Sequence, residues 1–166
     1  MLENYKHKNQ VIACDDDCSK PKAAEAFFKQ LDAIAMEMMS DQNTIDPMVC
    51  YYELPSGEVL GCTIGWDNQA ERVAALGRLR DTFEEANAIR YGLIAEAWTP
   101  SSQDPDRKEV VVLIMSERGR EAVSGFREII RSQSSVSLGP LLRGTADGWM
   151  AELLGKPTSN GSKALH

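Results

Sequence analysis

Apolar and polar residues follow two different periods along this chain, and the change of period separates expected helices from expected strands. The first helix is predicted from about residue 20 to residue 39. Ser19 can cap its start, and Pro21 suits the first turn because the missing N–H costs nothing there. Apolar residues then recur at helical spacing, at Phe27, Leu31, Ile34 and Met38.

A second helix is predicted after Asp67 or Asn68, either of which can act as its N-cap. Its polar face carries several charged residues. Its apolar face is marked by residues three or four apart, namely Val73, Leu76, Leu79, Phe83 and Ala86. This is the clearest amphipathic element in the sequence, and Phe83 is expected to lie in the core.

Five segments are typical of β-strands. Residues 48–54 and 58–64 flank the turn sequence Pro55-Ser56-Gly57 and predict a hairpin. Residues 89–98 and 109–115 follow, and the second of these is apolar at consecutive positions, as in a strand covered on both faces. Residues 121–131 fit either a helix or a strand, and their position after a central strand favours a strand.

The remaining segments complete the expected fold. Residues 145–154 predict a short last helix that stops at Gly155, residues 1–18 a loose N-terminal arm, and residues 157–166 a disordered tail. The order α-β-β-α-β-β-β-α predicts an α+β fold with a mixed or antiparallel sheet of about five strands, two main helices and a short C-terminal helix. We expect a single domain over residues 1–156.

Charge and composition narrow the classes of function. The chain has 166 residues and a net charge of −7, which argues against direct nucleic-acid binding, since that needs a basic stripe. Its longest apolar run, residues 110–115, is too short to span a bilayer. Residues 1–6 are polar and give no export signal, so we expect a cytoplasmic protein with reduced cysteines and no membrane association.

The usual catalytic arrangements are missing from the sequence. The two histidines, His7 and His166, lie in the polar terminal segments, so a serine or cysteine nucleophile would lack its customary base. No glycine-rich phosphate loop is present. These observations lead us to expect no cofactor and favour a protein that is not an enzyme.

One group of charged residues could nevertheless perform chemistry. Glu96, Asp104, Asp106 and Glu109, with Arg107, surround one strand–loop–strand connection, and paired carboxylates can exchange protons or bind Mg²⁺. If the two strands pair in antiparallel fashion, Glu96 and Glu109 approach each other. One of their pKa values should then rise unless a cation compensates. The alternative is an ordinary exposed turn.

A metal site is the second chemical candidate. Cys14, Asp15, Asp17 and Cys18 fall within five residues, but a closed zinc site normally takes four Cys or His ligands. The cysteines that could complete it, Cys50 and Cys62, belong to the predicted hairpin and can face each other there. An acidic turn that leads into the first helix is the simpler interpretation, and we expect no bound metal.

Binding of another protein is the interpretation that these observations favour. Trp66, Trp98 and Trp149 are candidate anchors near the ends of elements, and Met36 belongs to a methionine-rich helix end. The leading hypothesis is a non-catalytic interaction or accessory domain that binds a protein partner or itself, as a homo-oligomer, through a sheet edge or helix face. The alternatives are a small enzyme or ligand-binding protein whose cleft uses the carboxylates with Arg90 and Arg107, and an acidic mimic of nucleic acid.

Overall fold

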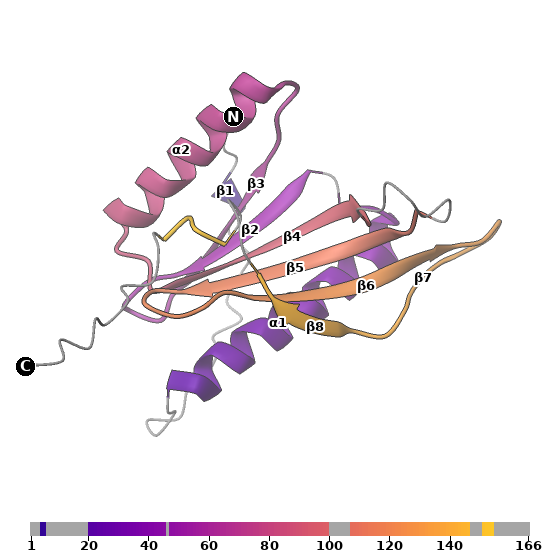
Figure 1. Cartoon of the computed structure of the whole chain (residues 1–166), viewed down its shortest axis with the longest axis horizontal. Helices are drawn as coiled ribbons and strands as arrows, with labels where there is room; N and C mark the ends of the chain where they lie inside the picture. Colours follow the sequence, from indigo (N-terminus) through magenta and orange to yellow (C-terminus); the bar gives the residue numbers. More distant parts are fainter. Residues whose placement is uncertain (1–3, 6–19, 46, 100–106, 147–150, 155–166) are drawn as a thin grey trace, which may run out of the picture.

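The computed structural model describes residues 4–5, 20–45, 47–99, 107–146 and 151–154, which form an antiparallel sheet with one helix on each face (Figure 1). Seven strands follow one another in the order β1-β3-β2-β4-β5-β6-β7, and β8 pairs with β6 beside β7. The elements are β1 (Asn4–Tyr5), α1 (Lys20–Gln42), β2 (Met48–Glu53), β3 (Val59–Ile64), α2 (Gln69–Glu85), β4 (Arg90–Trp98), β5 (Glu109–Glu117), β6 (Val123–Arg131), β7 (Val136–Leu138) and β8 (Leu142–Thr145).

Alternation along the strands divides the core into two clusters, one under each helix. In β5, Val111, Leu113 and Met115 face α1, whereas the residues between them face α2. The strand is therefore apolar at consecutive positions because both of its faces are covered, as the sequence predicted. On the α2 side Phe83 is fully buried, and its ring stacks on Tyr91 with 5.0 Å between the centroids.

Helix α1 approaches the sheet closely at two glycines. A Cβ atom at Gly92 of β4 would overlap the end of the Leu31 side chain, and one at Gly125 of β6 would lie 2.7 Å from the Phe28 ring. Leu31 and Phe28 are each only 1% exposed. The two glycines therefore act as sockets for the two side chains, and they fix how near the helix axis can lie to the strands.

Two arginines also hold α1 to the edge of the sheet. Arg127 of β6 makes two hydrogen bonds of 2.7 Å to the Asp32 carboxylate and a third, of 2.8 Å, to the Gly139 carbonyl. Arg143 of β8 bonds the Glu25 carboxylate at 2.8 Å, and its guanidinium carbon lies 4.1 Å from the centre of the Phe28 ring. Such bidentate and stacked geometries suit the planar guanidinium group.

Helix α2 begins as the sequence predicted, with Asn68 as its N-cap. The Asn68 side chain accepts a 3.0 Å hydrogen bond from the Glu71 N–H, and the Glu71 carboxylate accepts one of 2.9 Å from the Asp67 N–H. The helix ends before Asn87, whose φ of 52° lies in the left-handed region. The bond from the Glu71 N–H satisfies a donor that the first turn of α2 leaves open, and the bond from the Asp67 N–H fixes the chain that enters the helix.

The α+β class is confirmed, but the expected number of five strands is too low. The five predicted strands are β2 to β6, including residues 121–131. The additional strands are β1, within the segment predicted as a loose arm, and the short strands β7 and β8, whose Ser- and Gly-rich sequence gives no clear alternation.

Strands β7 and β8 together form one edge strand that is interrupted by a bulge. Ile129 pairs with Leu138 in β7, and Phe126 pairs with Leu142 in β8. Two residues of β6 lie between these pairs, and three residues, 139–141, lie opposite them. The extra residue makes this segment a β-bulge, which reverses the alternation of faces between β7 and β8.

The predicted C-terminal helix is wrong for the residues that the structure describes. Thr145 ends β8, and residues 151–154 lie in turns, while residues 147–150 and Gly155 are outside the described part of the chain. Burial is achieved without a helix, because Leu153 is 3% exposed and its N–H donates to the Tyr91 hydroxyl over 3.2 Å. Neither described helix is both long and apolar enough to cross a membrane.

The socket at Gly92 can be tested against a glycine that has free space. Gly92→Ala should lower the free energy of unfolding by about 1–3 kcal/mol, because the new methyl group overpacks Leu31. Gly77→Ala, in the middle of α2 with no atom within 4 Å of the added Cβ, should raise it by up to about 1 kcal/mol. Urea unfolding measures both changes. Equal effects at the two positions would contradict the close approach of α1 to β4.

Candidate functional site

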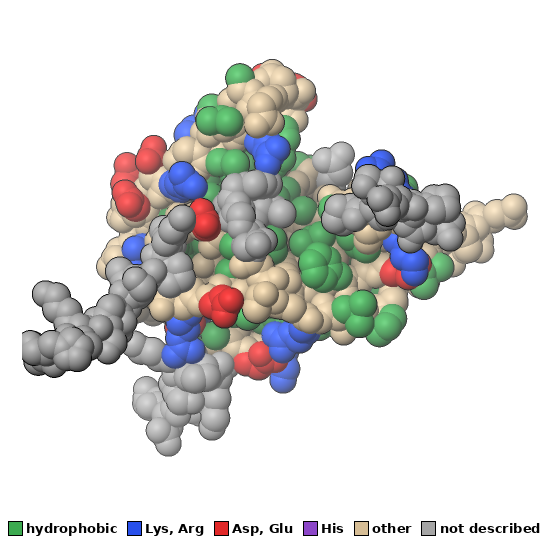
Figure 2. Space-filling model, viewed as in Figure 1, with side chains coloured by type: hydrophobic (Ala, Val, Ile, Leu, Met, Phe, Trp, Pro, Cys, Tyr) green, Lys and Arg blue, Asp and Glu red, His purple; other side chains and the backbone are tan. Residues whose placement is uncertain are grey.

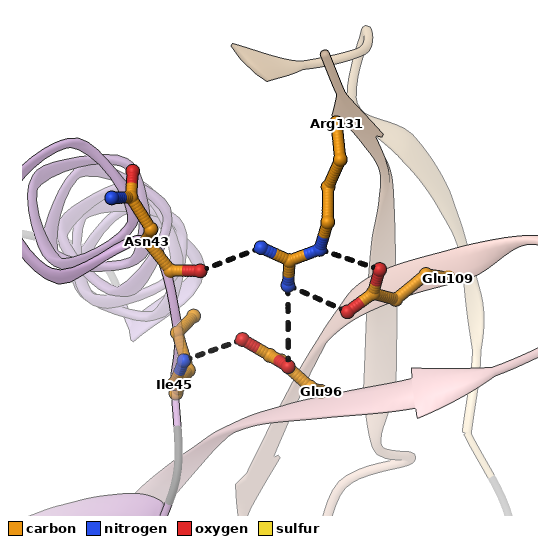
Figure 3. Close-up of polar contacts among 5 residues, drawn as sticks. All are labelled: Asn43, Ile45, Glu96, Glu109 and Arg131. Carbon is orange, nitrogen blue, oxygen red and sulfur yellow. Dashed lines mark hydrogen bonds and ion pairs between the residues drawn. The ribbon is translucent and has the colours of Figure 1, made fainter. Parts of the chain in front are cut away.

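The predicted carboxylate pair forms at the open end of β4 and β5. These strands pair in antiparallel register with Glu96 opposite Val111 and Trp98 opposite Glu109, so Glu96 and Glu109 lie diagonally on the face that α1 covers. Figure 3 shows the two carboxylates directed toward one guanidinium group, that of Arg131 at the end of β6. The structure therefore brings together two of the predicted site residues and adds an arginine that the sequence analysis did not select.

Arg131 uses its whole guanidinium group in this cluster. Its Nε and Nη2 atoms donate to the two Glu109 oxygens over 2.8 and 2.6 Å, and Nη2 lies 3.7 Å from Glu96 Oε2. Its Nη1 atom donates over 2.8 Å to the Asn43 carbonyl oxygen, just beyond the end of α1. Donation to a carbonyl at a helix C-terminus also offsets the partial negative charge there.

Glu96 secures the chain that leaves α1. Its Oε1 atom accepts a 2.6 Å hydrogen bond from the Ile45 N–H (Figure 3). Asn43 adopts a left-handed conformation with φ of 59° and bonds back to the Met39 carbonyl over 3.0 Å, which closes the helix. The cluster thus joins three strands to the segment between α1 and β2.

The electrostatics of the cluster favour a structural clamp. Hydrogen bonding to Arg131 lowers the pKa of the Glu109 carboxyl below its usual value, and the bond to Glu109 raises the pKa of Arg131. The expected cation is therefore present, and Glu109 is held as a carboxylate. A general acid needs its pKa moved upward, toward the working pH, so this geometry does not suit Glu109 to donate protons near neutrality.

The other predicted site residues do not join this cluster in the described part of the chain. Arg107 is exposed just before β5. Asp104 and Asp106 lie outside the described residues, as do Cys14, Asp15, Asp17 and Cys18 of the candidate metal site. Among the described residues no three His, Cys, Asp or Glu side chains are grouped so that they could hold a metal ion.

Cys50 and Cys62 do face each other across β2 and β3, as the hairpin predicted. Both are free thiols in the α2-side core. Burial is the main cause that raises the pKa of Cys50, while the hydrogen bond from Cys50 lowers the pKa of Cys62. The two thiols are enclosed among apolar side chains, so they are shielded from dissolved reagents in the folded protein.

Arg90, which the sequence analysis placed in a cleft, is buried in a row of charges across three strands. It stands opposite Glu53 of β2 and Glu117 of β5, at 2.6 and 3.5 Å from their carboxylates. Burial raises the pKa of Glu53 despite its bond to Arg90. Within the described part of the chain, Arg90 Nε and Glu117 Oε2 have no hydrogen-bond partner. A buried row of this kind fixes strand register, since a one-residue slip would leave charges unpaired.

A shallow groove runs between the second half of α1 and β7. It has a volume of about 340 Å³ and is lined by Met36, Met39, Ser40, Asn43, Ser134, Ser135, Val136 and Leu138. These side chains are small, apolar or uncharged, so the groove can receive an apolar side chain but offers no acid, base or metal ligand.

Large apolar side chains are exposed on the opposite face of the sheet. Phe126 and Ile130 of β6 and Leu142 of β8 are 40, 49 and 66% exposed, and we name these three residues the β6–β8 patch. The sequence analysis missed this patch because the apolar residues of β6 fitted a helix as well as a strand. Of the predicted tryptophan anchors, Trp98 is exposed, Trp66 lies under the guanidinium of Arg72, and Trp149 is outside the described residues.

Comparison of the chain with protein-family models, with curated proteins and with solved structures gave no match. Its function must therefore be inferred from the geometry of its own surfaces. Two features are candidates for the functional surface: the carboxylate clamp around Arg131 and the β6–β8 patch.

The clamp predicts a pH-dependent contribution to stability. Glu109 has a lower pKa in the folded chain than in the unfolded chain. The ion pair therefore stabilises the fold above the unfolded pKa of about 4.3, and this stabilisation is lost as the pH falls through the folded pKa. Arg131→Met should cost about 1 kcal/mol at neutral pH, the upper range for a partly exposed pair, and the cost should shrink below about pH 4. Urea unfolding at several pH values measures it.

Arg107→Met provides the matched control, since Arg107 is exposed at the same end of the sheet. It should change the unfolding free energy by less than about 0.5 kcal/mol at every pH. A cost of Arg131→Met that stays constant down to pH values where carboxylates are protonated would show that the ion pair does not act as described.

Proposed function

We propose that this chain is a non-catalytic interaction domain that binds a protein partner through the β6–β8 patch. The observation that carries the proposal is the exposure of Phe126, Ile130 and Leu142 on one face of neighbouring strands. Large apolar side chains that are exposed together on one face are typical of surfaces that bind other proteins.

The register of the strands places the three side chains together. Phe126 and Ile130 are four residues apart in β6 and so point to the same face, and Leu142 is the direct cross-strand neighbour of Phe126. This face is opposite to the one that α1 covers, because α1 contacts Gly125, Arg127 and the other odd-numbered positions of β6.

Helix α2 leaves this part of the sheet open. The core cluster under α2 contains residues of β2, β3, β4 and β5, and none from the described residues of β6 or β8. Figure 1 shows α2 displaced toward the β1–β3 side, and Figure 2 shows hydrophobic side chains at the surface beside it, over the strands. The open area is a consequence of the position of α2.

The charges near the patch suit a binding surface. Lys108 and Glu128, on the same face, pair with each other at 3.1 Å and leave little net charge there. Glu128 stands between Phe126 and Ile130, so the patch is an apolar surface crossed by one ion pair, and interfaces between proteins commonly mix apolar and polar side chains in this way. Most of the net charge of −7 therefore lies outside this region.

The other surfaces support binding of a protein more than catalysis. The carboxylates around Arg131 are engaged in holding α1 to the sheet, and the groove beside α1 has no ionisable lining residue. A reaction would need a free acid, base, nucleophile or metal ligand in a concave site, and neither surface offers one among the described residues.

A photo-crosslinking residue can test the proposal inside cells that express the chain. Placed at Ile130, it should give a discrete covalent adduct, because the patch is in contact with a partner. The adduct should disappear in the double variant Phe126→Ser/Leu142→Ser, which removes most of the apolar contact area. Because both side chains are exposed, the free energy of unfolding of the double variant should lie within about 1 kcal/mol of the wild-type value.

Val73 is the matched control position, since it is an apolar residue of α2 that is 62% exposed and remote from the patch. The same cross-linking residue at Val73 should give no discrete adduct. Equal adducts from Val73 and Ile130, or an Ile130 adduct that persists in the double variant, would contradict binding through the patch.

A further inference from the structure

The outer edge of β8 carries backbone groups that are available for pairing. The Ala146 N–H donates to the Ala122 carbonyl over 3.0 Å. Because backbone groups alternate along an antiparallel strand, the N–H and C=O groups of residues 142, 144 and 146 are directed toward β6. The N–H and C=O groups of Arg143 and the N–H of Thr145 are then directed away from β6, whereas the Thr145 carbonyl accepts a bond from the Ser124 hydroxyl of β6. No strand pairs with that outer side among the residues that the structure describes, and all four residues of β8 are exposed.

The edge strand is protected against pairing at the bulge between β7 and β8, and it is unprotected along β8. The bulge at residues 139–141 contains Pro140, which has no N–H to donate, and both features normally prevent strands from adding to a sheet. Strand β8 has neither feature. Its charged residue, Arg143, is directed toward α1 and paired with Glu25, so its charge does not prevent another strand from pairing with the edge.

No contact among the described residues requires a glycine at position 144 of β8. Among them, a Cβ atom there would meet only the Ser124 hydroxyl oxygen, at 3.4 Å, unlike the sockets at Gly92 and Gly125. Glycine weakens a strand, and within one it often marks a position that another backbone approaches closely. Gly144 and Leu142 lie on the same face as the β6–β8 patch.

We propose that β8 pairs with β8 of a second copy of this chain, in antiparallel orientation about a two-fold axis at Gly144. This inference goes beyond the proposed function, because the pairing uses the outer edge of β8 and leaves the β6–β8 patch open on the face of the sheet. Arg143 then pairs with Thr145 of the second copy, and the outward N–H of Thr145 donates to the Arg143 carbonyl.

Charge selects this register over its neighbour. A shift that places Arg143 on the axis would set two arginines opposite each other, which destabilises a strand pair. With Gly144 on the axis, Leu142 lies opposite Ala146 of the second copy, and the two patches join into one apolar surface on the same face of a continuous sheet. The ion pairs Lys108–Glu128 and Arg143–Glu25 keep this region nearly neutral, so two copies of net charge −7 can meet there with little repulsion.

Charge substitutions on the axis test the proposal directly. In sedimentation of the full chain up to about 100 µM, the wild type should form a dimer with a micromolar or lower Kd. Gly144→Glu and Gly144→Lys should each weaken the dimer by about tenfold or more, because like charges meet on the axis. An equimolar mixture of the two variants should associate again, which also shows that both are folded.

A second pair of variants addresses the backbone. Thr145→Pro removes an outward N–H without taking a bond from the β6 ladder, and it should abolish the dimer. Thr145→Ala keeps the N–H and should leave the Kd within about twofold of the wild type. Circular dichroism should give the same folded signal for both variants.

Two results would overturn the self-pairing. One is a wild-type chain that stays monomeric up to about 100 µM, and the other is a dimer that Gly144→Glu and Thr145→Pro leave unchanged. Neither result decides the proposed function, because an Ile130 adduct whose mass corresponds to a different protein would still support binding through the patch. Ile130 lies six residues along β6 from Ser124, the residue opposite Gly144, so its adduct reports on the patch and the Gly144 and Thr145 variants report on the edge.

Discussion

The close contact between α1 and the sheet is the constraint on which the other features depend. Gly92 and Gly125 let Leu31 and Phe28 lie against the backbone of β4 and β6. Once the helix is this near, acidic side chains and the carbonyl at its end come within reach of Arg127, Arg131 and Arg143. Apolar packing sets the distance, and the arginines then fix the position of the helix along the strands.

This constraint explains why the two faces of the sheet differ. On one face, Phe28, Asp32 and Glu25 of α1 contact Gly125, Arg127 and Arg143, which fixes β6 and β8 without a helix on the other face. Helix α2 packs on β2 and β4 through Phe83 and does not extend to β6. A face that no helix covers can keep apolar side chains exposed, and the β6–β8 patch lies on this face.

The sequence predicted the elements whose signals are local. Both helices, the hairpin and the central strand follow from apolar spacing, caps and turn residues, and Asn68 was one of the two predicted cap residues of α2. Strands β7 and β8 could not be predicted, because they are short, rich in Ser and Gly, and stabilised by pairing with β6. The prediction of a last helix was wrong for a related reason, since residues 151–154 are buried against Tyr91 without forming a helix.

The candidate site was predictable in part. Antiparallel pairing of β4 and β5 brings Glu96 and Glu109 together, and that pairing follows from their order in the sequence. Arg131 is 22 residues from Glu109, and only the register of β6 against β5 places it there. Arg90 looked like a cleft residue because the sequence does not reveal that Glu53 and Glu117 stand on both sides of it.

The one-residue bulge at 139–141 also decides which side chains of the edge strand meet which environment. Even-numbered residues face α1 in β7, whereas odd-numbered residues face it in β8. Deletion of a single residue from the bulge would turn β8 over. Leu142 would then point toward α1, and Arg143 would leave Glu25 and stand on the open face. The identity of this surface therefore depends on chain length at one loop as much as on side-chain chemistry, so a short deletion here would alter it more than most substitutions.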